Sequence, residues 1–228
     1  MLGQIVYRAQ RGGKLGVEET SLCGVKILRL GFDPDSIWAG WSVKRAGRFL
    51  VGAGVRRILT PEYFEQWESL QKLGLREVNP VGFLRVHATP LTLAALKKRG
   101  NRPERCAVAL RGERVDRGVE RTAMELCARV RDVCISFPKG GEALRKQLRG
   151  ELGAAVRPDY ADVESAVRYT NDTWEQGGTV LDLFAPRPEP GGVEVKLAGL
   201  SQSDTKDLHL AAVLWEVGRI GVEDLEFT

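Results

Sequence analysis

CAVALRGERVDRGVERTAMELCARVRDVCISFPKGG, residues 106–141, is the stretch that decides the fold. It holds two apolar runs without polar alternation, 106–110 and 133–137, separated by residues with helical apolar spacing. Continuous apolar runs are typical of strands buried on both faces, and strands that alternate with helices build parallel β-α-β units. We therefore expect two adjacent parallel strands, joined by a helix that Asp116 caps.

The same alternation continues on both sides of this stretch. Toward the N-terminus, apolar spacing predicts helices over 36–53, 60–73 and 81–99 and strands over 55–59 and 75–78. Residues 60–62 (Thr-Pro-Glu) combine an N-cap, a first-turn proline and an acid, and Thr89-Pro90 predicts a break in the helix around it. Toward the C-terminus, a helix opens at 138–141 and ends at Gly153, before a strand over 154–156.

These elements fall into two similar halves, residues 25–78 and 104–156, each with three strands. The helical stretch 79–101 joins them. Two such halves resemble the doubly wound, Rossmann-like fold, an α/β architecture with a mostly parallel sheet and helices on both faces. The resemblance implies one continuous sheet over residues 25–156.

The domain organisation follows from this layout. The Rossmann-like α/β core is expected over residues 25–157, preceded by an N-terminal strand and loop extension, 1–24. Beyond the core, apolar and polar residues alternate, which is typical of half-buried strands. We expect residues 158–228 to form small antiparallel hairpins and a C-terminal helix (207–219) packed on the core, with an edge strand over 224–227.

The composition is that of a globular protein, since 43% of the 228 residues are hydrophobic and 28% are charged. The net charge of +4 is spread along the chain, which argues against a nucleic-acid partner. No apolar run reaches the ~18 residues of a membrane span, and the N-terminus lacks the apolar stretch of a signal peptide. We therefore expect a cytoplasmic protein without a membrane partner.

The four cysteines show no metal-binding or redox pattern. Cys106 and Cys134 lie in apolar runs and Cys127 lies on a helix face, where cysteine acts as a small hydrophobic residue. No C-x-x-C pair occurs, and neither histidine is close enough in sequence to complete a zinc site. We expect all four, including Cys23, to be reduced and structural, and no metal to be bound.

Ligands of parallel α/β sheets bind outside the carboxyl ends of the strands, where the strand order reverses. The loop after the first quoted strand places Arg111, Gly112 and Arg114 there. Dinucleotide-binding loops carry G-x-G-x-x-G at this place, whereas only Gly112 and Gly118 are present here, so the resemblance is one of position. The arginines would attract a phosphate and the neighbouring carboxylates would repel it. Alternatively, Asp116 only caps its helix.

The loop after the second quoted strand, residues 138–142, is the more suggestive of the two. Free amides at a helix start bind anions, paired glycines let a phosphate approach, and Lys139 adds a positive charge. Lys139 would suit the 2′-phosphate of NADP better than the free ribose of NAD. The plain alternative is that Gly140 and Gly141 only make the turn that starts the helix.

No catalytic constellation is evident. The sequence contains no G-x-S-x-G, P-loop or H-E-x-x-H motif, and His87 and His209 stand alone. Three function classes stay open. The first is a ligand-binding or regulatory protein with a degenerate nucleotide crevice, and the second is an oxidoreductase or transferase that uses NAD(P) or another phosphorylated cofactor. The third is a scaffold that binds a protein partner through the helices of Trp38, Trp41 and Trp215.

Overall fold

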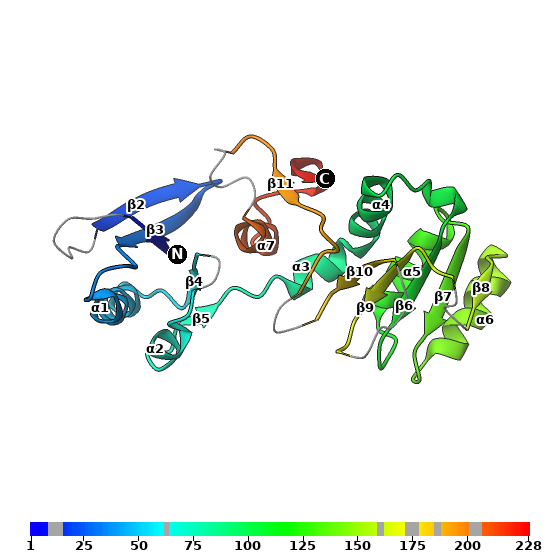
Figure 1. The fold of residues 1–228 in the computed structure, drawn as a ribbon, viewed down its shortest axis with the longest axis horizontal. Coiled ribbons are helices and arrows are strands. Elements are labelled where there is room, and N and C mark those ends of the chain that lie inside the picture. Colours follow the sequence, from blue (N-terminus) through cyan, green and yellow to red (C-terminus); the bar gives the residue numbers. More distant parts are fainter. Residues whose placement is uncertain (9–15, 62–63, 159–161, 172–177, 185–187, 201–206) are drawn as a thin grey trace. The chain divides into compact units, whose positions relative to one another are not determined.

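The computed structural model describes residues 1–8, 16–61, 64–158, 162–171, 178–184, 188–200 and 207–228. These residues form two compact units. The first unit comprises Met1–Asn79 and His209–Gly221, and the second comprises Pro80–Leu208 and Val222–Thr228. Each unit contains its own five-stranded sheet (Figure 1). The expectation of one continuous sheet over residues 25–156 is therefore wrong.

The first sheet has the strand order β2-β3-β1-β4-β5. Its strands are β1 (Leu2–Tyr7), β2 (Gly16–Leu22), β3 (Val25–Phe32), β4 (Arg57–Leu59) and β5 (Arg76–Glu77). β1 is central and parallel to both β3 and β4, and only β2 runs antiparallel. Among the described residues, every strand of this sheet comes from residues 2–77.

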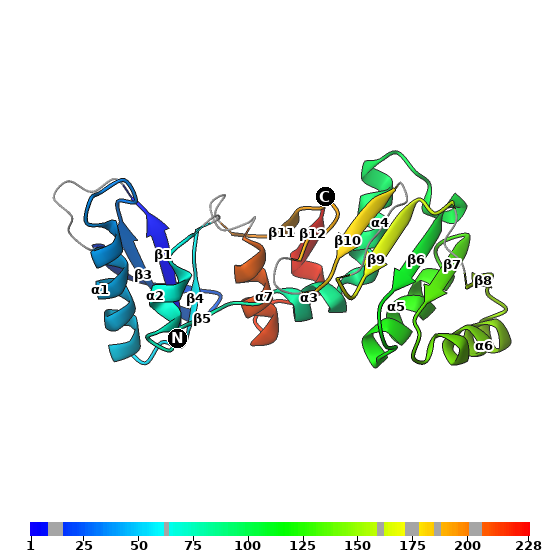
Figure 2. The same cartoon turned by 60° about the horizontal axis from the view of Figure 1, so that its bottom comes forward.

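Helices α1 (Ala39–Gly52) and α2 (Trp67–Gln71) connect β3 to β4 and β4 to β5, and they contact each other (Figure 2). Leu50 of α1, Ile58 of β4 and Leu70 of α2 are fully buried in one cluster. The core of the first unit therefore lies between this helix pair and the sheet. The last helix, α7 (Leu208–Glu216), is tied to β4 by an ion pair of 2.6 Å between Arg57 Nη2 and Glu216 Oε2.

The helix predicted over residues 60–73 is much shorter than its sequence signals indicate. Pro61 and residues 64–66 are not helical, and residues 62–63 of the predicted start lie outside the described residues. Phe64 is buried in the core of the first unit, with its ring edge-to-face against Trp67 at 5.6 Å. The approach to α2 is thus fixed by burial of an aromatic ring, which overrides the local start signals.

The second sheet has the strand order β10-β9-β6-β7-β8, and all its strands are parallel. Its strands are β6 (Ala107–Arg111), β7 (Asp132–Ser136), β8 (Val156–Arg157), β9 (Ser165–Arg168) and β10 (Thr179–Asp182). The predicted parallel pairing of β6 and β7 is confirmed. Numbered along the chain the order is 5-4-1-2-3, which is that of a doubly wound sheet. The Rossmann-like α/β fold class is confirmed, with the order reversal between β6 and β9.

β9 and β10 correct the expectation for the C-terminal part of the chain. They are parallel strands of the second sheet, whereas antiparallel hairpins were predicted. Ser165, Ala166 and Val167 are all fully buried, and β9 lies between β6 and β10. The predicted small antiparallel segment exists farther along, as β11 (Val195–Leu197) paired with β12 (Leu225–Phe227).

The helices on the second sheet form one layer. α4 (Ala88–Lys98) contacts α5 (Arg117–Cys127), which contacts α6 (Gly141–Leu152), and each of them also contacts strands of the sheet. Helices on opposite faces of a sheet cannot touch one another, so these three lie on the same face. The sequence led us to expect helices on both faces; the connections from β8 to β9 and from β9 to β10 show no helix within their described residues.

The helical stretch before β6 breaks as predicted, but two residues earlier. α3 (Val81–Val86) ends at His87, where α4 begins, and Pro90 therefore lies in the first turn of α4. A proline in the first turn loses no intrahelical hydrogen bond, which explains why the break falls ahead of it. Two short 3-10 turns, Pro103–Arg105 and Val222–Asp224, lead into β6 and β12.

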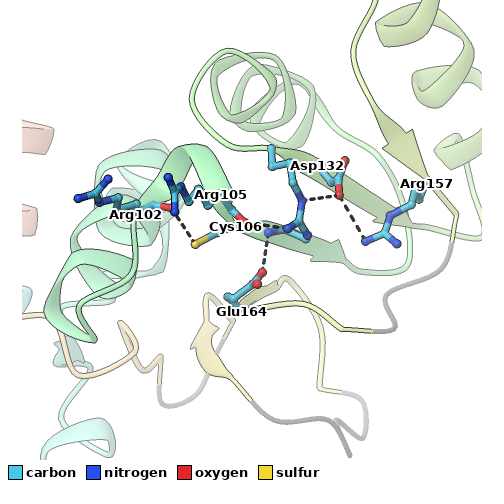
Figure 3. A network of polar contacts seen from close by, with 8 residues as sticks. Arg102, Arg105, Cys106, Asp132, Arg157 and Glu164 are labelled. Carbon is cyan, nitrogen blue, oxygen red and sulfur yellow. Dashed lines mark hydrogen bonds and ion pairs between the residues drawn. The ribbon is translucent and has the colours of Figure 1, made fainter.

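A polar network fixes the amino end of β6 (Figure 3). The N–H of Ala107 donates to Glu164 Oε2 at 2.6 Å, and the N–H of Glu164 donates to Ala107 O at 3.1 Å. Beside this pair, Arg131 contacts Asp132 Oδ2 at 3.0 Å and donates to Arg105 O at 2.9 Å. The network holds the entry to β9 on β6, at the edge opposite to the carboxyl ends of the strands.

Candidate functional site

The carboxyl ends of β6, β7 and β9 meet at one edge of the second sheet. The loops after β6 and β7 lie side by side there, and Arg114 forms a parallel bridge with Lys139. The N–H of Val115 donates to Lys139 O at 2.9 Å, and the N–H of Lys139 donates to Glu113 O at 3.2 Å. The structure thus brings together the two loops that hold the predicted site residues Arg111, Gly112, Arg114, Lys139, Gly140 and Gly141.

Gly112 packs the strand ends together. A Cβ at this position would lie 2.6 Å from Phe137 Cε1 and 3.1 Å from Tyr169 Cβ, so no larger residue fits without displacing a neighbour. The N–H of Gly112 donates to Ser136 O at 3.3 Å. This amide is engaged with the end of β7, and a ligand could use it only by breaking that hydrogen bond.

The start of α5 is closed by its own carboxylate. Asp116 is the N-cap, as predicted, and its Oδ1 accepts the N–H of Val119 at 2.9 Å. Counted from Gly112, the second and third glycines of a dinucleotide fingerprint correspond to Arg114 and Arg117, both exposed. At α5, therefore, side chains stand where a pyrophosphate-binding loop has glycines, and Asp116 already occupies a helix amide that a pyrophosphate would use.

Aromatic rings fill the point where the strand order reverses. The rings of Phe137 and Tyr169, which follow β7 and β9, have centroids 6.1 Å apart. Burial raises the pKa of Tyr169 to about 12, although the Thr122 hydroxyl and the Arg85 guanidinium act in the opposite direction. The Tyr169 hydroxyl makes no hydrogen bond of normal geometry with any described residue. The nearby Thr122 hydroxyl donates to Gly118 O.

The start of α6 differs from that of α5. Its N-cap is Gly140, at a left-handed φ of 85°, and no side chain caps the first amides. Lys139 and Gly140 are exposed, whereas Gly141 is buried. Glu142, in the first turn, pairs with Lys146 at 3.1 Å, and this contact lowers the pKa of Glu142. The uncapped helix start beside Lys139 is the arrangement at this edge that could hold an anion.

The sequence did not lead us to the polar residues at the carboxyl ends of β9 and β10. Arg168 and Asp182 form a bidentate pair with N–O distances of 2.5 and 2.6 Å, and their side chains are only 13% and 19% exposed. Arg85, in α3, donates to Leu183 O at 2.8 Å and to Tyr169 O at 2.9 Å. Opposite charges at the ends of two short apolar runs were the available signal. Antiparallel hairpins would have placed them at different edges.

His87 and the cysteines, the other candidate groups, have the surroundings of packed side chains. His87 is buried, with Nδ1 2.8 Å from Phe83 O and its ring beside Phe83 and Phe227; burial lowers its pKa. The four cysteines, all within the described residues, form no disulfide bond, and Cys106 and Cys134 are buried. Among the described residues, no group of three or more His, Cys, Asp and Glu side chains could hold a metal ion. No described helix has both the length and the apolar character needed to cross a bilayer.

Comparisons with known proteins add little to this geometry. No family model matches the sequence, and no curated protein matches it. Among solved structures, L-tryptophan dehydrogenase from Nostoc punctiforme is 16% identical with a TM-score of 0.31, covering 64% of this chain and 44% of that one. Shikimate 5-dehydrogenase from Listeria monocytogenes, in complex with shikimate and NAD, is 11% identical with a TM-score of 0.29. The match covers 74% of this chain and 68% of that one.

The aspartate transcarbamoylase catalytic subunit from M. jannaschii is 12% identical with a TM-score of 0.28, covering 73% of this chain and 60% of that one. The chain thus spans less than half the length of the tryptophan dehydrogenase and about two thirds of the shikimate dehydrogenase. The Rossmann-like fold is read from the strand order of the second sheet, and function has to be argued from the site.

Proposed function

We propose that the second unit binds a phosphorylated small molecule at the start of α6, as a ligand-binding or regulatory protein. The residues of the proposed site are Lys139, Gly140 and Gly141, with Arg111, Gly112 and Arg114 as the adjoining loop. The observation that carries the proposal is the uncapped start of α6 at the carboxyl edge of the sheet, next to the β6 loop. A phosphate there would accept the first amides of the helix and pair with Lys139.

The geometry supports a ligand smaller than a dinucleotide. NAD or NADP would need the start of α5, where Asp116 already accepts a helix amide, and the reversal point, where Phe137 and Tyr169 pack. Lys139 could attract the 2′-phosphate of NADP, which is a phosphate monoester. A sugar phosphate or a mononucleotide also carries a phosphate monoester, without the rest of the dinucleotide. The proposal is therefore binding of a monophosphate, and it assigns no catalytic pair.

The test is a calorimetric and thermal-shift series with inorganic phosphate, sugar phosphates, AMP, NAD and NADP. A ligand present at 100 times its Kd stabilises the protein by ~2.7 kcal/mol. We expect Lys139→Ala to weaken binding by about 1–2 kcal/mol, the scale of one charge-assisted hydrogen bond. Lys97→Ala is the matched control, because Lys97 is an exposed lysine in the last turn of α4, which leads to the amino end of β6.

Two outcomes would overturn the proposal. One is the absence of stabilisation by any of these compounds at millimolar concentration, and the other is equal binding to the Lys139→Ala variant and the parent. Substitution of Gly141 is a poor test, because a Cβ there would lie 3.2 Å from Phe137 Cβ and would disturb packing as well as access. A preference for NADP over AMP and sugar phosphates would instead support the dinucleotide alternative.

A further inference from the structure

An apolar patch lies on the exposed side of α1 and the turn before it. Ile37, Trp38, Trp41 and Phe49 are 91%, 60%, 55% and 46% exposed, and these four residues are called the α1 patch below. Large aromatic side chains bury 150–250 Å² when covered, so the α1 patch offers on the order of 400 Å² of surface. An exposed patch of that size on a soluble unit is often an interaction surface.

Charges of opposite sign lie along the α1 patch, the acidic ones before the helix and the basic ones between Trp41 and Phe49. Lys44, Arg45 and Arg48 are exposed in the later part of α1, which contains no acidic residue. Asp33 and Asp35 precede the helix, in a turn where Asp33 Oδ1 accepts the N–H of Asp35 at 3.0 Å. The surface thus runs from an acidic turn, past the exposed rings of Trp38 and Trp41, to a basic stretch, 44–48, that precedes Phe49.

The aromatic and basic groups share one helix face. Trp41, Arg45 and Phe49 follow one another at intervals of four residues, which places them along one side of a helix. The guanidinium carbon of Arg45 lies 5.2 Å from the centroid of the Trp41 ring, in a cation-π contact. The first unit therefore presents Trp41 at the middle of the patch, with cations beside it and beyond it.

We propose that the α1 patch binds a second copy of this chain, with the two α1 helices antiparallel about a twofold axis. In a twofold contact the same surface is used on both copies, so it must be complementary to itself. Antiparallel pairing centred near Trp41 sets the acidic turn of each copy beside the basic stretch, 44–48, of its partner, and it also opposes the two helix dipoles. Parallel pairing would bring like charges together.

A second copy fits this surface better than a partner of uniform charge. An anionic bilayer or an acidic protein would attract Lys44, Arg45 and Arg48 but would repel Asp33 and Asp35, whereas a second copy pairs both groups with opposite charges. A standard interface buries ~800 Å² on each partner. The α1 patch supplies about half of that, and the flanking charged side chains add the rest, so we expect a dimer that dissociates on dilution.

The test is sedimentation velocity on the full chain over a concentration series. We expect reversible dimerisation, and we expect Trp41→Glu to leave a monomer at every concentration, since it puts a charge at the centre of the contact. Asp35→Arg and Arg48→Glu should each weaken the dimer by about tenfold, which corresponds to ~1.4 kcal/mol. Lys26→Gln, at an exposed lysine of β3, is the control and should leave the dimer unchanged.

The double variant Asp35→Arg/Arg48→Glu decides between occupants. In the antiparallel dimer it exchanges the two charges and should restore most of the affinity that each single variant loses. A monomer at all concentrations, or a double variant no better than the single ones, would overturn the proposal. If Arg48→Glu abolished and Asp35→Arg strengthened binding to phosphatidylglycerol vesicles, the patch would instead be a site for an anionic surface. None of these results depends on ligand binding in the second unit.

Discussion

Tyr169 should make the second unit sensitive to alkaline pH. Its phenol is buried at the carboxyl end of β9, which raises its pKa from the ordinary value of 10.0 to about 12. In the unfolded chain the phenol ionises near pH 10, while in the folded chain it stays neutral until about pH 12. The folded state therefore binds one more proton across this window, and raising the pH favours unfolding.

The size of the effect follows from the two pKa values. Below about pH 10, the ionisation of Tyr169 does not change the free energy of unfolding. Its ionisation in the unfolded chain lowers that free energy by ~1.4 kcal/mol at about pH 11 and by ~2.7 kcal/mol above about pH 12. Tyr169→Phe removes the ionisable group and keeps the ring contact with Phe137. Because the Tyr169 hydroxyl lacks a hydrogen bond of normal geometry, the variant should be about as stable as the parent at neutral pH.

The assay is urea denaturation of the parent and of Tyr169→Phe at a series of pH values from neutral to strongly alkaline. Lysines, cysteines and the other tyrosines titrate in both proteins, so only the difference between the two curves reports on Tyr169. The difference should grow in favour of Tyr169→Phe as the pH rises through 10. Parallel curves would refute the reasoning, as would an ultraviolet titration in which every phenol ionises at its ordinary pH.

Three further outcomes test other features of the structure. Asp182→Ala should lower the free energy of unfolding by about 2–3 kcal/mol, because it removes the bidentate carboxylate from the largely buried Arg168 guanidinium. Hydrogen exchange should localise the loss to β9 and β10. Asp116→Ala should cost about 1 kcal/mol in urea denaturation, the usual value for a lost N-cap. In thiol titration Cys23 should react at once, whereas Cys134 should react only after denaturation, and early reaction of Cys134 would contradict its burial.

Residues that determine local backbone structure were predictable from the sequence. Asp116 caps α5 through its own side chain, and Gly140 and Gly153 bound α6 at left-handed φ values of 85° and 60°. In each case the residue type and its immediate neighbours decide the conformation. The two loops that hold the predicted site residues lie side by side, as expected, because adjacent parallel strands place their following loops next to each other. That a ligand binds there stays a prediction.

Strand pairing between distant segments could not be predicted in the same way. β1 lies at the centre of the first sheet, and β9 lies beside β6 in the second. The residues of β1 and β9 contain no sequence signal that identifies the strand with which each one pairs. β9 spans only four residues, Ser165–Arg168, of which the first three are fully buried, and it has a parallel strand on each side. An isolated strand of that length is equally compatible with a hairpin, so the Arg168–Asp182 pair stayed hidden until the topology was known.

The second sheet has the strand order of a dinucleotide-binding fold, but side chains of this chain occupy the place where a dinucleotide would lie. The residues that do so also stabilise the carboxyl edge of the sheet. Asp116 satisfies the start of α5, and Phe137 and Tyr169 close over Gly112 at the reversal of strand order. Each of these contacts stabilises the carboxyl edge of the sheet and simultaneously removes a surface that a pyrophosphate would need. Strand order alone is therefore a poor guide to the ligand of this chain. The start of α6 is different, because Gly140 supplies the turn without supplying a cap, and so stability there does not compete with anion binding.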